Sequence, residues 1–341
     1  MSHLAAIQES PKAPFVIKEV PTPEPGEDEI LIRNELIGLV PVDMKMAKYG
    51  IPPIASYPAI LGNSFGGIVT AVGSAVTRLE VGDKVAVNRS FGTGNHHGPF
   101  QQFALAKARY AAKVSSDADL HGPVGTIGNI TTIVAMLSGY MGLQRPDLGK
   151  PRPENGQKIL VYGGTSSVGF LATQYLVQAG YDVVTTTSPK NRSLVSVLDA
   201  IQVVDHTQDS RSVLDALLAH GPYDNVIDAI SLPGTTKITA AVLHAQGGGK
   251  LYTLLPPMGP EMIPETVERV FQPWATALME EKDADLGNWA VQVYYQQALE
   301  RGKLAHLPTI KVPGGLVGLN DACDILERGV SATKVVVDPR E

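Results

Sequence analysis

The fold is decided by the stretch Ile159-Leu160-Val161-Tyr162-Gly163-Gly164-Thr165-Ser166-Ser167-Val168-Gly169. Its apolar start predicts a buried strand, its small residues predict a tight turn, and a helical pattern begins at Val168. Glycine lets the backbone turn sharply and approach a ligand, and the free N–H groups at a helix N-terminus attract negative charge. The stretch therefore predicts a site for a pyrophosphate, although Ser166 or Ser167 stands where the middle glycine of G-x-G-x-x-G is expected.

The residues that follow continue this strand–turn–helix pattern. Apolar runs predict strands at Lys158–Gly163, Asp182–Thr187, Gln202–Val204, Asn225–Ala229 and Lys250–Leu255. Between them, helical periodicity is found at Val168–Ala179, Arg192–Leu198 and Ser212–Ala219. Alternating strands and helices imply right-handed crossovers, and so an α/β domain with a doubly wound parallel sheet over residues 123–299.

The two flanks, residues 1–122 and 300–341, have a different texture, rich in Gly, Pro and short strands. These strands are expected at Glu29–Asn34, Gly66–Val72, Lys84–Asn88, Gln101–Ala106, Thr309–Val312 and Lys334–Asp338. Short, closely spaced strands with turn signals between them predict a partly open β-barrel or sandwich. We expect the C-terminal tail to rejoin this β domain, giving a chain of 341 residues with two domains.

Composition excludes several classes of function. The net charge is −6 and there is no basic block, which argues against a nucleic-acid partner. No apolar run is long enough to span a membrane, and the N-terminus does not resemble a signal peptide. The single cysteine, Cys323, rules out internal disulfides and any zinc site with two or more thiolates, and it fits a cytoplasmic protein. Its surroundings predict a buried helix face.

The end of the second strand indicates which dinucleotide binds. An NAD enzyme usually has Asp or Glu there to bind the ribose 2′-hydroxyl. Here the strand runs into Ser188-Pro189-Lys190-Asn191-Arg192, which has no carboxylate. A hydroxyl and two cations suit a 2′-phosphate, so the sequence predicts NADPH; the alternative is a solvated turn with two surface cations.

Further segments resemble the medium-chain dehydrogenases/reductases along nearly the whole chain. They are Pro21–Arg33, Gly38–Asp43, Tyr57–Gly62, Gly66–Val69 and Val81–Val85. The resemblance implies a GroES-like β-barrel domain joined to a Rossmann domain. Within the family the chain is most similar to the trans-acting enoyl reductases of fungal polyketide pathways, through Asn95–Gln101, the glycine–serine loop and Ser188–Asn191.

The same resemblance addresses the metal of the zinc alcohol dehydrogenases. Val40 stands where those enzymes have a cysteine ligand, and Asn63 stands where they have a histidine ligand. Neither a valine nor a lone asparagine can anchor Zn²⁺. The resemblance therefore implies an enzyme without catalytic zinc.

The resemblance also implies a set of cofactor contacts. Pyrophosphate would be bound by the loop, the 2′-phosphate by the segment after the second strand, and the nicotinamide would lie against two leucines. His206 stands where the family often has a tyrosine, and a short stretch of the β domain would also reach the cofactor. These residues are Thr165, Ser166, Ser167 and Val168; Ser188, Lys190 and Asn191; Leu254 and Leu255; His206; and Asp43 and Lys45. Either leucine could equally be ordinary core.

Without a metal, conjugate reduction is the expected chemistry: hydride goes to the β-carbon of an activated alkene and charge gathers on the carbonyl oxygen. Such an oxyanion needs hydrogen-bond donors. Lys45 is the candidate catalytic donor, with Tyr49 and Tyr140 as weaker ones, and Lys45 could instead bind a cofactor phosphate or lie on the surface. His96 and His97 fit a surface turn better than a proton donor.

A candidate substrate segment follows the β domain. It mixes small, apolar and hydroxyl residues and could line a cleft for an acyl chain, or could be an ordinary core helix. The residues proposed for substrate binding are Asn129, Thr131, Thr132, Ile133, Val134 and Met136.

Three functions remain open on these grounds. The first is an enoyl reductase acting on a polyketide thioester carried by a separate synthase, and the second is a reductase of quinones or unsaturated ketones. The third is a protein that binds NADPH without turnover, because fold alone does not fix function. The sequence is compatible with a monomer or a homodimer.

Overall fold

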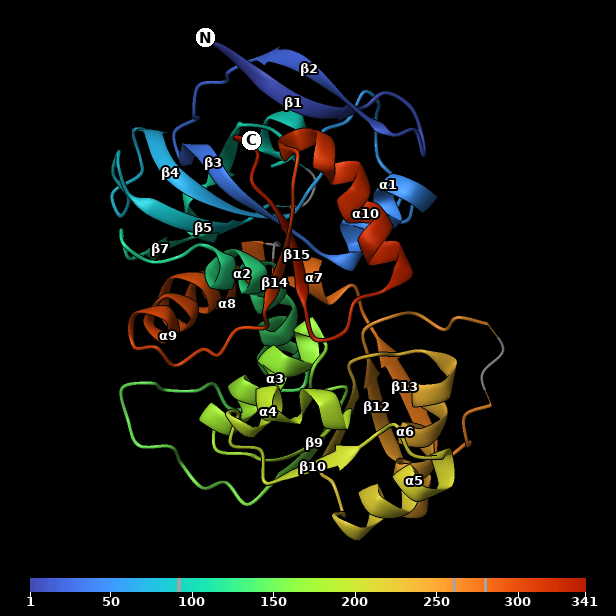
Figure 1. Ribbon diagram of the computed structural model, residues 1–341. Coiled ribbons are helices and arrows are strands. Elements are labelled where there is room, and N and C mark those ends of the chain that lie inside the picture. The colour runs from blue at the N-terminus through green and yellow to red at the C-terminus, as the bar shows by residue number, and fades with distance from the viewer. Residues whose placement is uncertain (91–92, 260–261, 279–280) are drawn as a thin grey trace. The chain divides into compact units, whose positions relative to one another are not determined.

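The computed structural model describes residues 1–90, 93–259, 262–278 and 281–341 (Figure 1). The chain forms two compact units, one made of Met1–Thr131 with Met279–Glu341 and the other of Thr132–Leu278. The sequence placed these divisions at 122/123 and 299/300. The first unit is larger than expected because helical segments before and after the parallel sheet pack within it. For example, Tyr295 Oη donates to the carbonyl of Pro123 at 2.6 Å.

The second unit is built on a six-stranded parallel sheet. Its strands are β8 Lys158–Tyr162, β9 Asp182–Thr187, β10 Gln202–Asp205, β11 Asn225–Asp228, β12 Gly249–Thr253 and β13 Val267–Phe271. Their spatial order is β10-β9-β8-β11-β12-β13, and every neighbouring pair is parallel. This confirms the doubly wound sheet, and it places the point where the strand order reverses between β8 and β11.

Helices precede, connect and follow these strands (Figure 1). They are η3 Ala135–Tyr140, α3 Ser167–Gln178, η4 Pro189–Asn191, α4 Arg192–Ser196, α5 Ser210–Ala219, α6 Pro233–Ala245 and α7 Trp274–Ala277. Both α5 and α6 share a buried apolar cluster with the sheet. Leu160, Val184, Val226 and Leu251, one from each of four strands, are fully buried in one cluster with Leu217 of α5. Burial on both faces explains why the inner strands read as continuous apolar runs.

The first unit is a mostly antiparallel β structure. Its strands are β1 Ser2–Gln8, β2 Phe15–Pro21, β3 Glu29–Leu39, β4 Ser64–Val72, β5 Lys84–Asn88, β6 Phe103–Lys107, β7 Ala111–Val114, β14 Thr309–Val312 and β15 Lys334–Val337. The main sheet has the order β14-β15-β3-β4-β5-β7, and β6 pairs with β3. Because β15 lies between β14 and β3, the tail rejoins the β domain as the sequence predicted.

The first unit also contains helices. They are α1 Pro41–Tyr49, η1 Asn95–His97, η2 Ala108–Tyr110, α2 His121–Val134, η5 Glu281–Asp283, α8 Ala284–Asn288, η6 Trp289–Tyr295, α9 Gln296–Glu300, η7 Gly315–Gly318 and α10 Leu319–Arg328. The last helix of its first segment, α2, continues past Thr131 into the second unit. Cys323 is 2% exposed on α10, which agrees with its predicted place on a buried helix face. No helix in the described ranges combines the length and the apolar character that crossing a bilayer requires.

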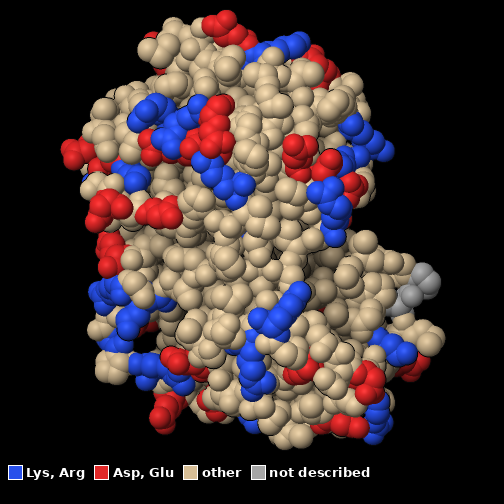
Figure 2. All heavy atoms as spheres, viewed as in Figure 1, with Lys and Arg blue, Asp and Glu red and all other residues tan. Residues whose placement is uncertain are grey.

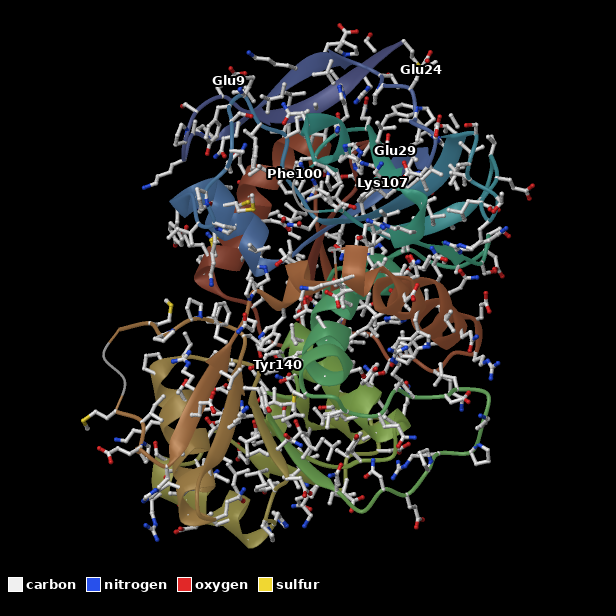
Figure 3. All side chains as sticks on the ribbon, turned by 180° about the vertical axis from the view of Figure 1, so that it is seen from behind. Glu9, Glu24, Glu29, Phe100, Lys107 and Tyr140 are labelled. Atoms are coloured by element: carbon white, nitrogen blue, oxygen red, sulfur yellow. The ribbon has the colours of Figure 1, made fainter. Side chains whose placement is uncertain are left out.

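Charged groups of both signs are interspersed over the face shown in Figure 2, between broad uncharged areas. Figure 3, which views the molecule from behind, shows Glu29 and Lys107 close together in the β unit. Glu29 Oε1 lies 3.2 Å from Lys107 Nζ and 2.9 Å from His97 Nε2, and these partners lower the Glu29 pKa against the opposing effect of burial. His97 is therefore a hydrogen-bond partner of Glu29, and its absence from the chemistry stays a prediction.

Candidate functional site

The loop after β8 has the close backbone approach that its glycines predicted. Gly163 has φ of +93°, which favours glycine, and its N–H donates to Thr186 Oγ1 at 2.8 Å. A Cβ on Gly164 would lie 2.2 Å from Thr185 Oγ1. The loop is thus pressed against the end of β9, and no larger residue fits at Gly164.

The loop leads directly into the N-terminus of α3. Ser166 is the N-cap, and its Oγ accepts from Gly169 N at 3.0 Å. A Cβ on Gly169 would lie 2.2 Å from the Gly163 carbonyl, so a glycine is also needed in the first turn. Thr165, Ser167 and Val168 remain partly exposed around this helix end. This twelve-residue helix follows a glycine loop and begins beside the point where the strand order reverses. Its N-terminus is therefore suited to binding a pyrophosphate.

The segment after β9 presents the groups predicted for a 2′-phosphate. Ser188 is buried, yet no hydrogen-bond partner is found for its Oγ in the described part of the chain. Lys190 is exposed and Asn191 is partly exposed on η4. A buried hydroxyl without a protein partner calls for an external one, and a bound phosphate would supply it. His206 is exposed, with its ring 6.4 Å from that of Tyr162.

The predicted nicotinamide wall follows β12, and its backbone is held on two sides. Leu254 N donates to Ser231 Oγ at 2.7 Å, and Arg269 Nη2 donates to the carbonyl of Leu255 at 2.9 Å. Both leucines are partly exposed. Sequence analysis missed Ser231 and Arg269, because neither belongs to a recognisable motif. The one available signal was Asp228, a carboxylate at the end of a buried strand.

In the β unit, Asp43 is fully buried at the start of α1. Its Oδ2 accepts from Val40 N at 2.8 Å, and Asn63 Nδ2 donates to its other oxygen. Burial raises the Asp43 pKa to about 6, although these hydrogen bonds and the nearby cations oppose the shift. Burial also lowers the pKa of Lys334 to about 8 and that of Arg89 to about 10, and Asp43 opposes both shifts. Val40 and Asn63, which are expected to replace two zinc ligands, thus both donate to a buried carboxyl group that also interacts with two cations.

The candidate proton and hydrogen-bond donors differ in their surroundings. Lys45 is partly buried on α1, near Asp43 in sequence, and the described residues provide no hydrogen-bond acceptor for its ammonium group. Tyr49 Oη donates to Glu327 at 2.6 Å on the surface. Tyr140, labelled in Figure 3, packs its ring 5.2 Å from that of Trp274. Lys45 is the candidate without such a partner.

The predicted substrate segment is helical, in α2 up to Val134 and then in the π-helical turn η3. Ile133, Val134 and Met136 are buried, as is Asn129, whereas Thr132 is partly exposed. The Thr131 hydroxyl accepts from Asn88 Nδ2 at 3.0 Å. These side chains have packing partners, and their role toward substrate stays a prediction.

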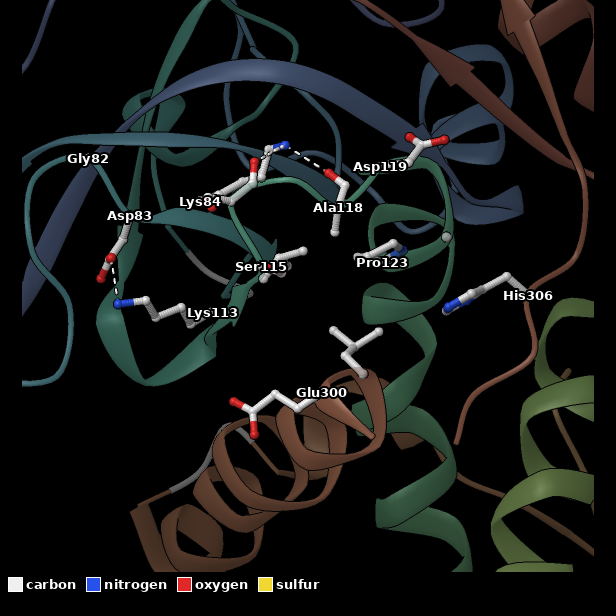
Figure 4. Close-up of a pocket in the computed structure, with 14 residues that line it drawn as sticks. Gly82, Asp83, Lys84, Lys113, Ser115, Ala118, Asp119, Pro123, Glu300 and His306 are labelled. Carbon is white, nitrogen blue, oxygen red and sulfur yellow. Dashed lines mark hydrogen bonds and ion pairs between the residues drawn. The ribbon is translucent and has the colours of Figure 1, made fainter. Parts of the chain in front are cut away.

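A separate hollow of about 670 Å³ lies in the β unit (Figure 4). Its lysines are already paired, since Lys84 Nζ donates to the carbonyls of Ser116 and Ala118 at 3.1 and 2.7 Å. Lys113 Nζ lies 2.6 Å from Asp83 Oδ1. Because both lysines of this hollow already have partners, the second unit offers the better nucleotide site.

The described residues contain no group of three or more His, Cys, Asp or Glu side chains that could hold a metal ion. The Val40 N–H and the Asn63 side chain both donate to Asp43. The absence of catalytic zinc remains a prediction.

Comparison with known proteins identifies both the domain and the family. A family model described as the alcohol dehydrogenase GroES-like domain matches residues 26–116. The dehydrogenase azaJ of Aspergillus niger is 31% identical, over 98% of this chain and 99% of the relative. The trans-enoyl reductase himH of Aspergillus japonicus is 32% identical, over 91% and 89%. The mycobacterial protein Rv1454c, solved in complex with NADPH, has the same fold, with a TM-score of 0.75, 22% identity and coverage of 99% and 100%.

Proposed function

Because the chain belongs to the medium-chain dehydrogenase/reductase family of oxidoreductases, as an enoyl-reductase-type member, we propose that it is an NADPH-dependent enoyl reductase. Its substrate would be an α,β-unsaturated thioester of polyketide type, carried by a separate synthase in the cytoplasm. The observation that carries the NADPH assignment is the end of β9, where a buried, unpartnered Ser188 hydroxyl is followed by Lys190 and no carboxylate.

The residues of the second unit would hold the cofactor along the carboxyl edge of the sheet. The loop Gly163–Ser167 and the N-terminus of α3 would bind the pyrophosphate, and Ser188 and Lys190 would bind the 2′-phosphate. Leu254 and Leu255 would exclude water from one side of the nicotinamide. When bound, the cofactor supplies a hydride for the β-carbon of the alkene.

The β unit would contribute Lys45, whose ammonium group donates to the thioester carbonyl oxygen as charge develops there. A positioned donor to such an oxyanion typically lowers a barrier by about 3–4 kcal/mol. The α-carbon then takes a proton to complete the reduction. Zinc plays no part in this proposal, since valine and asparagine replace two of its ligands.

The assay that tests the function compares acceptors with the intact protein. NADPH oxidation, followed by the loss of nicotinamide absorbance, is expected with enoyl thioesters and not with quinones or simple unsaturated ketones. Turnover of quinones alone would make the protein a quinone reductase, and tight NADPH binding with no acceptor would make it a non-catalytic binder. Size-exclusion chromatography would separate the monomer from the homodimer.

Lys190→Ala tests the choice of cofactor. Loss of a charge-assisted contact with the 2′-phosphate should weaken NADPH binding by about 1.5–3 kcal/mol and leave NADH binding nearly unchanged. Isothermal titration with both cofactors measures this, and Lys237→Ala, which removes an exposed lysine from α6, is the matched control. Equal loss for both cofactors would show that Lys190 does not bind the 2′-phosphate.

A further inference from the structure

Ser231 has an unusual backbone conformation at the carboxyl edge of the parallel sheet. It follows β11, is fully buried, and has φ of +58°, a region that residues other than glycine seldom occupy. Such strained residues persist only where their surroundings hold them, and they concentrate at functional sites. Three hydrogen-bonding groups of neighbouring residues hold Ser231 in this conformation: a carboxylate oxygen and the carbonyl of Asp228, and the N–H of Leu254.

Asp228 organises the turn that contains Ser231. One carboxylate oxygen accepts from the N–H groups of Ile230 and Ser231 at 3.0 and 2.8 Å, and the other accepts from Thr235 Oγ1 at 2.7 Å. The Thr236 hydroxyl lies 3.3 Å from that second oxygen. The turn is therefore fixed both to the end of β11 and to the first turn of α6.

Ser231 then connects this turn to the loop after β12. Its Oγ donates to the Asp228 carbonyl at 2.6 Å and accepts from Leu254 N at 2.7 Å. The hydroxyl uses both its hydrogen and a lone pair, so no other rotamer would make the same two bonds. The position of Leu254 thus depends on the turn after β11.

The same turn also contacts the glycine loop after β8. A Cβ on Gly163 would lie 2.7 Å from Cγ1 of Ile230, so the two loops are in direct van der Waals contact. The loop after β11 thus contacts both the loop after β8 and the loop after β12 at the switch point. Dinucleotides lie across this point, with one mononucleotide half on each side, and the β11–β12 side is the half remote from the 2′-phosphate segment of β9.

We propose that Ser231 is a positioning residue for the nicotinamide half of the cofactor. By holding the Leu254 amide, it sets the distance between the wall beside the nicotinamide and the loop that binds the pyrophosphate. The adenosine half depends on α3 and on the end of β9, which Ser231 does not touch. This inference rests on the proposed NADPH function.

The test compares two ligands in variants of the full chain. Ser231→Gly removes the hydroxyl and tolerates the positive φ, whereas Ser231→Ala removes the hydroxyl and keeps the strain. NADPH and 2′-phospho-ADP-ribose, which lacks the nicotinamide, are titrated against each variant. Thr239→Val is the control, since it deletes another buried hydroxyl, one that donates to the Thr235 carbonyl at 2.9 Å within α6.

Both Ser231 variants should bind NADPH about tenfold more weakly, the loss expected for one buried hydrogen bond, and bind 2′-phospho-ADP-ribose within about twofold of wild type. The kcat should fall while the KM for the thioester stays constant. The control should bind both ligands as wild type does, and thermal unfolding of all variants shows whether they are folded.

Equal weakening of both ligands, or no weakening of either, would overturn the positioning role and leave the proposed function intact. Failure of the wild-type protein to bind NADPH would instead refute the proposed function. The two failures are therefore distinguishable in one set of titrations.

Discussion

Asp43 shows how the β unit accommodates a buried charge. Taking a carboxylate out of water is costly unless hydrogen bonds and opposite charges compensate for it. Here the Val40 N–H and the Asn63 amide donate to it, and Lys334 and Arg89 provide positive charge nearby. The compensation is incomplete, which is why the Asp43 pKa is raised to about 6.

This shift predicts a pH dependence of stability that Asp43→Asn should remove. The folded-state pKa of about 6 exceeds the ordinary 3.8, so the native protein holds the proton more tightly than the unfolded chain does. The contribution to stability is complete below about pH 4 and is lost as the pH rises through 6, by up to about 3 kcal/mol.

Urea unfolding of wild type and Asp43→Asn at pH 4.5 and 7.5 gives the difference in unfolding free energy between the two proteins at each pH. The contributions of the other carboxylates cancel in this difference. The variant should gain stability relative to wild type at the higher pH. A difference that does not change with pH would mean that the Asp43 carboxyl group titrates normally.

Single residues were predictable where their role is set by local sequence. Ser188 and Lys190 directly follow a recognisable strand, so their place could be inferred. Ser231 could not be inferred, because its conformation is imposed by Asp228 and by the amide of Leu254 on the next strand. The proximity of Lys334 to Asp43 likewise arises only when the last strand joins the sheet.

Helices and strands with strong apolar patterns were predicted closely. The bounds of β5 and β9 agree with the expected ranges, and α3 differs by one residue at each end. Elements with weak patterns were missed. In β13 only Val267 and Val270 are buried, and α6 is rich in threonine with Pro and Gly at its start. Packing against the rest of the sheet determines those elements, and a short window of sequence does not contain that information.

The loop between β8 and α3 provides a prediction about its own construction. Gly164→Ala would place a methyl group 2.2 Å from Thr185 Oγ1, which itself donates to the Val161 carbonyl at 2.8 Å and cannot easily move. We expect a loss of about 1–3 kcal/mol in unfolding free energy, with weaker NADPH binding.

Gly234→Ala is the matched control, because nothing lies within 4 Å of a Cβ added at that position in α6. It should leave stability unchanged or raise it by less than about 1 kcal/mol. Urea unfolding curves of the two variants test this prediction. Identical midpoints would mean that the loop has room for a side chain at position 164.

The molecule as a whole is two units made by one chain that leaves the first and later returns to it. The sequence indicated this return through the strands of the tail. It did not indicate the exact divisions, because α2 and the helices after residue 281 have the same periodicity as helices that cover a parallel sheet. Only their contacts, such as Tyr295 with Pro123 and Thr126, assign them to the β unit.

The zinc content of the purified protein tests the chemistry of the whole enzyme. With Val40 and Asn63 in place of two ligands, we expect far less than one zinc per chain by elemental analysis. Treatment with a strong chelator should leave NADPH oxidation unchanged. Stoichiometric zinc, or activity that is lost with the chelator and restored by the metal, would contradict the metal-free mechanism.

The position of β15 has a consequence for folding during translation. This strand sits between β14 and β3 in the interior of the antiparallel sheet, yet it is translated long after its partner β3. All six strands of the parallel sheet are translated before β15. The second unit can therefore fold while the β unit still lacks its last strand. A nascent chain stalled before residue 334 would therefore expose the unpaired edge of β3, where chaperones could bind or other chains could aggregate.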